Sequence, residues 1–78
     1  MSNPCLLYQL QLNKAKETLT TLLQQRELID AKLLLNPISP ELHKDLRTIN
    51  LEIKITNNEI ELVESNLKAC EIKNNTSL

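Results

Sequence analysis

The stretch LLLNPISPELH, residues 33–43, decides the fold of this chain. It holds two of the three prolines in a 78-residue sequence that has no glycine. Ser39 followed by Pro40 is typical of a helix start, because serine caps free backbone N–H groups and proline fits the first helical position. Asn3 and Pro4 repeat this pattern near the N-terminus. The sequence therefore predicts two helices, over about residues 4–35 and 40–72, joined by a short turn.

Apolar residues recur at alternating spacings of three and four on both sides of the turn. Each predicted helix has nine such positions, of which eight are apolar. The row of the first helix is Cys5, Tyr8, Leu12, Ala15, Leu19, Leu22, Arg26, Ile29 and Leu33. The row of the second helix is Leu42, Leu46, Ile49, Ile53, Thr56, Ile60, Val63, Leu67 and Cys70. This spacing is that of a heptad core, so we expect an all-α, coiled-coil-like antiparallel hairpin.

The two rows also fit each other in one register. If Leu33 faces Leu42, each further layer pairs residues whose numbers add to 75, and the last layer pairs Cys5 with Cys70. The whole chain, residues 1–78, is then a single hairpin. Residues 73–78 are polar and terminal, so we expect this tail to fray.

Composition narrows the possible functions. The net charge is −1, and no basic stripe is present that would attract nucleic acid. No apolar run approaches the roughly 18 residues that span a bilayer, and the N-terminus lacks the features of an export signal. One histidine and two cysteines are too few for a metal site, and no acid, base and nucleophile group together. We therefore expect a cytoplasmic protein that is not an enzyme and has no cofactor.

Four polar or reactive residues on or near the rows need an interpretation. Cys5 and Cys70 would form a disulfide that staples the open end of the hairpin, or they are small buried thiols, which a reducing cytosol favours. Arg26, the only charged residue in the rows, is expected to reach past the core to Glu27, Asp45 or Glu52, and the alternative is that it fixes the register. His43 is expected to be a solvent-exposed helix residue.

A second set of aliphatic residues lies outside both rows. On the second helix these residues are Leu51, Ile55, Leu62, Ala69 and Ile72, and on the first they are Leu10, Leu28, Ala31 and Leu35. Two packed helices cannot bury these residues as well as the rows, so we expect them to meet another protein. The predicted interface consists of Leu51, Ile55, Leu62, Ala69, Leu10 and Leu28.

The opening of the second helix also carries a family resemblance. Pro40-Glu41-Leu42-His43 and the periodic aliphatics that follow resemble, over residues 38–63, the small helical-hairpin co-chaperones of type III secretion needle subunits. His43 stands where that family usually has tyrosine. The resemblance implies a cytoplasmic bacterial protein that stabilises a larger, tetratricopeptide-like chaperone. Together the two would keep the needle subunit monomeric by covering its apolar helix surface.

The alternative to a co-chaperone role is self-association of the hairpin. Two copies of the hairpin would bury their outer aliphatics in a four-helix bundle with a structural or regulatory role. This arrangement predicts a concentration-dependent homodimer, whereas a co-chaperone should be stabilised by a different chain.

Overall fold

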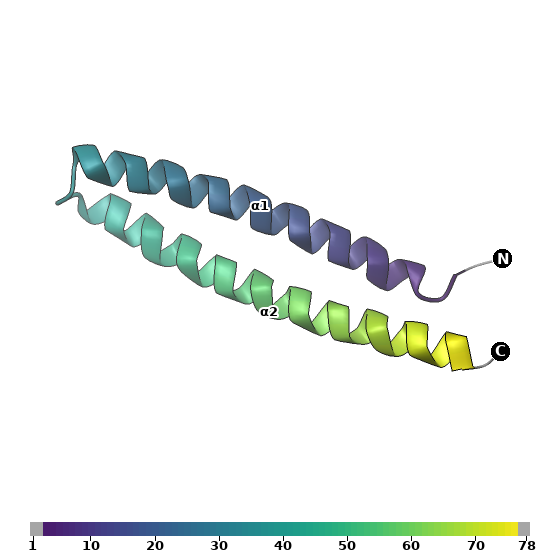
Figure 1. The fold of residues 1–78 in the computed structure, drawn as a ribbon. Helices are drawn as coiled ribbons and strands as arrows, with labels where there is room; N and C mark the ends of the chain where they lie inside the picture. Colours follow the sequence, from purple (N-terminus) through teal and green to yellow (C-terminus); the bar gives the residue numbers. More distant parts are fainter. Residues whose placement is uncertain (1–2, 77–78) are drawn as a thin grey trace.

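The computed structural model describes residues 3–76 as two long helices packed against each other. Helix α1 spans Leu6–Leu35 and helix α2 spans Pro40–Thr76, and residues 36–39 form the turn between them. The helices run antiparallel and side by side, so the start of α1 and the end of α2 lie together at the end opposite the turn (Figure 1). The prediction of an all-α, two-helix hairpin is confirmed.

The predicted side-chain cap forms at the start of α2 but not at the start of α1. Helix α1 begins at Leu6, two residues after the predicted start, and its N-cap residue is Cys5, which makes no side-chain cap bond. Asn3 Oδ1 instead accepts a hydrogen bond from the backbone N–H of Cys5 at 2.9 Å, ahead of the helix. Ser39 Oγ accepts one from the N–H of Leu42 at 3.3 Å, and Pro40 is the first residue of α2. This cap of α2 satisfies an N–H group that has no partner within the helix.

The turn itself is held by a histidine. His43 Nε2 donates a hydrogen bond to the carbonyl oxygen of Pro37 at 2.7 Å, which ties the first turn of α2 to the loop. The side chain is exposed, as expected, but it also has a structural contact that the sequence did not indicate. No residue of the described chain has a positive φ angle, so the turn needs no glycine.

The core lies along the predicted rows. Every buried or partly buried side chain of α1, and of α2 up to Asn74, belongs to one of the two rows. One cluster is centred on Leu12, Ala15, Ile60 and Val63, and the second is centred on Leu22, Ile49 and Ile53. Leu19 packs against both clusters and joins them into one core. The alternating spacing of three and four therefore identified the whole core.

Arg26 has a different partner from those expected. Its Nη1 donates to Asn50 Oδ1 at 3.3 Å, and within the described residues it pairs with none of the predicted carboxylates, Glu27, Asp45 or Glu52. The reason is geometric: Asp45 and Glu52 border the opposite side of the hairpin, where they line a groove that neither Arg26 nor Asn50 reaches.

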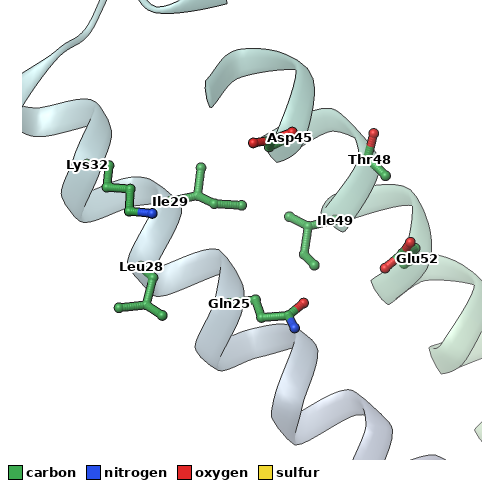
Figure 2. Close-up of a pocket in the computed structure, with 8 residues that line it drawn as sticks. All are labelled: Gln25, Leu28, Ile29, Lys32, Asp45, Thr48, Ile49 and Glu52. Atoms are coloured by element: carbon green, nitrogen blue, oxygen red, sulfur yellow. The ribbon is translucent and has the colours of Figure 1, made fainter. Parts of the chain in front are cut away.

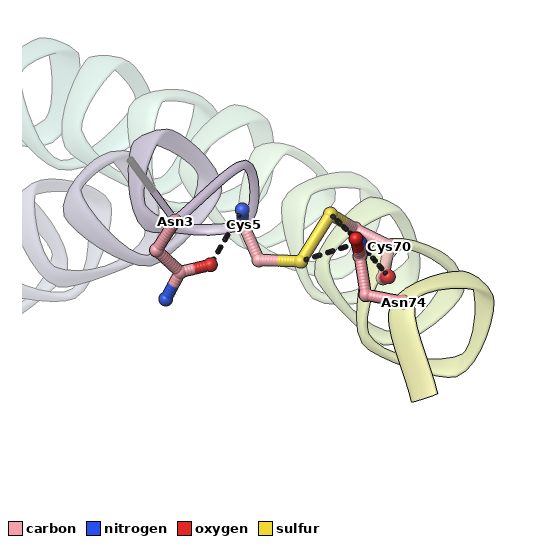
Figure 3. The surroundings of a disulfide bond; sticks show 4 residues. All are labelled: Asn3, Cys5, Cys70 and Asn74. Atoms are coloured by element: carbon pink, nitrogen blue, oxygen red, sulfur yellow. Dashed lines mark hydrogen bonds between the residues drawn. A yellow bond between two sulfur atoms is a disulfide. The ribbon is translucent and has the colours of Figure 1, made fainter. Parts of the chain in front are cut away.

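The open end of the hairpin is closed by a disulfide between Cys5 and Cys70, whose Cα atoms are 5.8 Å apart (Figure 3). The interpretation that both cysteines are free thiols therefore differs from the structure. The bond joins the two residues of the ninth layer, so it fixes the register in which residue numbers add to 75.

Helix α2 continues beyond its predicted end at residue 72. It runs to Thr76, so residues 73–76 of the tail that we expected to fray are helical, while residues 77–78 lie outside the described part. Asn74 Nδ2 donates to the carbonyl oxygen of Cys70 at 2.7 Å and lies 3.5 Å from each sulfur of the disulfide (Figure 3). These contacts tie the added turn to the cross-link.

Candidate protein-binding face

The side of α2 that faces away from α1 carries a row of exposed aliphatic side chains. Leu51, Ile55 and Leu62 are 59%, 56% and 62% exposed, and Ile72 is 53% exposed. Ala69 is exposed as well. None of these residues contributes to the core of the hairpin. Four of the six residues predicted for the interface thus lie on one helix face.

Two polar residues complete this row, and the sequence reasoning missed them. Asn58 and Ser65 fill its gaps, so that spacings of four and three alternate without a break from residue 51 to residue 72. Both side chains are exposed. At 1.5 Å per residue the row is roughly 32 Å long. We call it the outer face of α2; it consists of Leu51, Ile55, Asn58, Leu62, Ser65, Ala69 and Ile72.

The outer face has the geometry of a second coiled-coil core. Its residues repeat with the heptad spacing of the inner row but are displaced by about half a turn around the helix. A helix with apolar heptad positions on two opposite sides is suited to lie between two other helices. The hairpin supplies only one of them.

Charged residues flank the outer face with opposite signs on its two sides. We call Arg47, Lys54 and Lys68 the basic edge, and Asp45, Glu52 and Glu59 the acidic edge. All six side chains are exposed, and within the described residues none has an ion-pair or hydrogen-bond partner. The separation is cleanest between residues 45 and 59, because Glu61 interrupts the basic edge and Lys73 follows the acidic one.

The other two predicted interface residues, Leu10 and Leu28, do not join the outer face of α2. They lie on α1, are 55% and 63% exposed, and are separated by about 27 Å along the helix. The exposed polar residues Glu17 and Gln24 lie between them on the outward side of α1. The structure therefore does not bring the six predicted residues together into one site.

Leu28 borders a shallow groove between the helices near the turn. Ile29 and Ile49 point between α1 and α2, whereas Leu28 points away from α2 (Figure 2). The groove has a volume of about 400 Å³, and its rim includes Lys32 from α1 with Asp45 and Glu52 from α2. It is open and has no converging polar groups around an enclosed space, so it does not have the shape of a small-molecule site.

The most exposed aliphatic residues of the described chain lie at the turn. Leu34, Leu35 and Ile38 are 85% to 89% exposed. Of these three, only Leu35 belongs to the set that was expected to meet another protein. The sequence signal for the two leucines was the uninterrupted run of leucines before the first proline of the turn. These residues do not continue the outer face of α2, which begins at Leu51.

Within residues 3–76 no three His, Cys, Asp or Glu side chains come together in a way that could hold a metal ion. In the same range neither helix has a segment long and apolar enough to cross a membrane.

Comparisons of the chain with models of known protein families, with characterised proteins and with solved structures give no match. The fold and its surface define a two-helix hairpin with one uncovered heptad face.

Proposed function

We propose that this chain is a non-enzymatic protein-binding hairpin that uses the outer face of α2 to dock against a helix of another protein. The observation that carries this proposal is the unbroken heptad spacing of exposed residues from Leu51 to Ile72. Apolar helix surface of this length is costly to leave in water, and heptad spacing suits packing against a further helix.

The hairpin is more extended than a compact protein of its mass, which supports the proposal that part of its surface is buried against a partner. Its accessible surface is 6265 Å², whereas a compact monomer of 8.9 kDa exposes about 4,800 Å². Its radius of gyration is 17.8 Å, against about 11 to 12 Å for a compact domain of this length. The excess surface, about 1,500 Å², exceeds the roughly 800 Å² that each partner buries in a standard interface.

The specific role that we propose is that of a co-chaperone. The basis is the resemblance of residues 38–63 to the co-chaperones of type III secretion needle subunits. In this role the hairpin acts in the bacterial cytoplasm and stabilises a larger chaperone of tetratricopeptide-like repeats, whose stacked helices form extended concave surfaces for binding a helix. The two chains together cover the apolar helix surface of the needle subunit and prevent its self-assembly.

A cytoplasmic role has a consequence for the disulfide. Cytosolic thiols are usually kept reduced, so the disulfide between Cys5 and Cys70 counts against a cytoplasmic location and favours an oxidising compartment. Trapping of free thiols in intact cells, followed by mass spectrometry, measures the state of the pair.

Co-expression with a candidate repeat chaperone and needle subunit tests the function. The wild-type hairpin should co-purify with the chaperone, and Leu62→Asp should abolish this by placing a charge in the centre of the outer face. Gln24→Asp is the matched control, since it adds the same charge at an exposed site on the outward side of α1. Retention of the complex by Leu62→Asp would show that the outer face is not the docking surface.

A further inference from the structure

We infer that, when no other partner is present, the outer face of α2 binds the same face of a second copy of this chain, with the two α2 helices parallel and in register. This inference goes beyond the proposed function, because it specifies what covers the face in the free protein. A symmetric pair of this kind places each residue of the outer face opposite its own counterpart.

The polar residues of the outer face favour this arrangement. In register, Asn58 meets Asn58 of the second copy and Ser65 meets Ser65, so the amides and the hydroxyls can hydrogen-bond to each other. Leu51, Ile55, Leu62 and Ile72 then pack against identical aliphatic side chains. Asparagine at a core position of a heptad repeat is a known means of fixing register and helix number.

Antiparallel pairing gives poorer layers. In an antiparallel pair of helices, as in the core of the hairpin, the numbers of two facing residues add to a constant. For two copies of the outer face, the two registers with the largest central overlap have sums of 120 and 127. The first places Asn58 opposite Leu62, and the second places Asn58 opposite Ala69. In both registers a polar group is buried against an apolar side chain, which costs free energy because its hydrogen bonds to water are lost.

The charged edges support the parallel arrangement independently. In a parallel coiled coil, a residue that flanks the core on one side meets the residue five positions later on the other side of the partner helix. Arg47 is followed at that distance by Glu52, and Lys54 by Glu59. The two copies therefore form four attractive pairs across the interface. Lys68 and Lys73 repel in this register, but they lie near the end of the face.

A charge-exchange experiment tests the inference. One variant carries Arg47→Glu with Lys54→Glu, and the other carries Glu52→Lys with Glu59→Lys. Each variant alone should dimerise at least about tenfold more weakly than the wild type, because all four pairs become repulsive. A mixture of the two should recover wild-type affinity, since opposite charges then meet again. Analytical ultracentrifugation over a range of concentrations measures these affinities, and circular dichroism confirms that each variant is folded.

The outcomes separate this inference from the proposed function. A wild-type chain that stays monomeric at high micromolar concentration overturns it, as does a mixture that associates no better than the separate variants. Either result leaves docking to a different protein intact, because co-purification with that protein is measured separately. Conversely, a self-associating chain that fails to bind any candidate chaperone supports the dimer and counts against the co-chaperone role.

Discussion

Helix α2 has two faces with the same residue spacing and opposite surroundings. On the inner face Ile49, Ile53, Ile60 and Val63 are 6% to 8% exposed. On the outer face Leu51, Ile55, Leu62 and Ile72 are 53% to 62% exposed. Both faces follow the heptad, but the hairpin contains a helix to cover only one of them. The difference shows that a heptad pattern specifies a surface for helix packing and does not specify which chain provides the second helix.

The largest expected effect comes from placing a charge on the inner face. Ile60→Asp would bury a carboxylate in the cluster with Leu12, Ala15 and Val63, where it has no cationic partner. We expect the hairpin to unfold, with loss of the helical circular dichroism signal at room temperature. Leu62→Asp, two residues away on the outer face, should change the unfolding free energy of the dilute monomer by about 0.5 kcal/mol or less.

Equal destabilisation by Ile60→Asp and Leu62→Asp would show that the two faces do not differ as described. A chemical control is available in Ile60→Val, which keeps the position apolar. It should cost only about 1 kcal/mol.

The next largest effect concerns the disulfide that holds the inner faces in register. The bond closes a loop with a sequence separation of 65 residues, for which the loop-entropy estimate is about 4 kcal/mol. Reduction should therefore lower the urea midpoint of the wild-type chain strongly. Cys5→Ser should have the low midpoint in both conditions, and a midpoint of the wild type that is insensitive to reductant would contradict the prediction.

Much of the fold was predictable because it depends on local, periodic signals. Ser39-Pro40 carries its capping information in adjacent residues, and the two rows define both the core and the register. Asn3-Pro4 located the start of α1 only to within two residues, because the N-cap is Cys5 and makes no side-chain bond. The partner of Arg26 was not predictable in this way, since it depends on which side of the hairpin a long side chain follows. The contacts of Asn74 with Cys70 depend in turn on closure of the open end.

The candidate binding face was predictable only in part. Leu51, Ile55, Leu62 and Ala69 were identified because they are apolar, and Asn58 and Ser65 were missed because they are not. Leu10 and Leu28 were assigned to the same interface by their outward direction alone. Polar residues on α1 separate these two leucines. The prediction missed this separation because it considered only which residues are apolar.

A smaller effect is expected from the one charged residue of the inner rows. Arg26 is partly buried, so its guanidinium group loses part of its hydration, and its one hydrogen bond within the described residues goes to Asn50. Arg26→Leu should therefore raise the unfolding free energy by about 1 kcal/mol through added apolar burial. Lys16→Leu at an exposed position of α1 should give no such gain. A loss of stability in Arg26→Leu would show that the bond to Asn50 outweighs the burial.

An effect on stability of similar size concerns the start of α2, which positions both of its faces. Ser39→Ala removes the oxygen that accepts the N–H of Leu42 and should cost about 1 kcal/mol. Ser39→Asp retains a cap acceptor and should restore most of the loss. Thermal unfolding followed by circular dichroism measures both, and equal stability of Ser39→Ala and the wild type would argue that the cap is not formed in solution.

Photo-crosslinking in living cells tests most directly whether the outer face of α2 is covered by protein. A benzophenone amino acid would replace Leu62 on the outer face or, as the control, Gln24 on the outward side of α1. We predict protein adducts from position 62 and few or none from position 24, with the mass of the adduct distinguishing a different chain from a second copy. A position 62 that yields no more adduct than position 24 would contradict the proposal that this face binds protein.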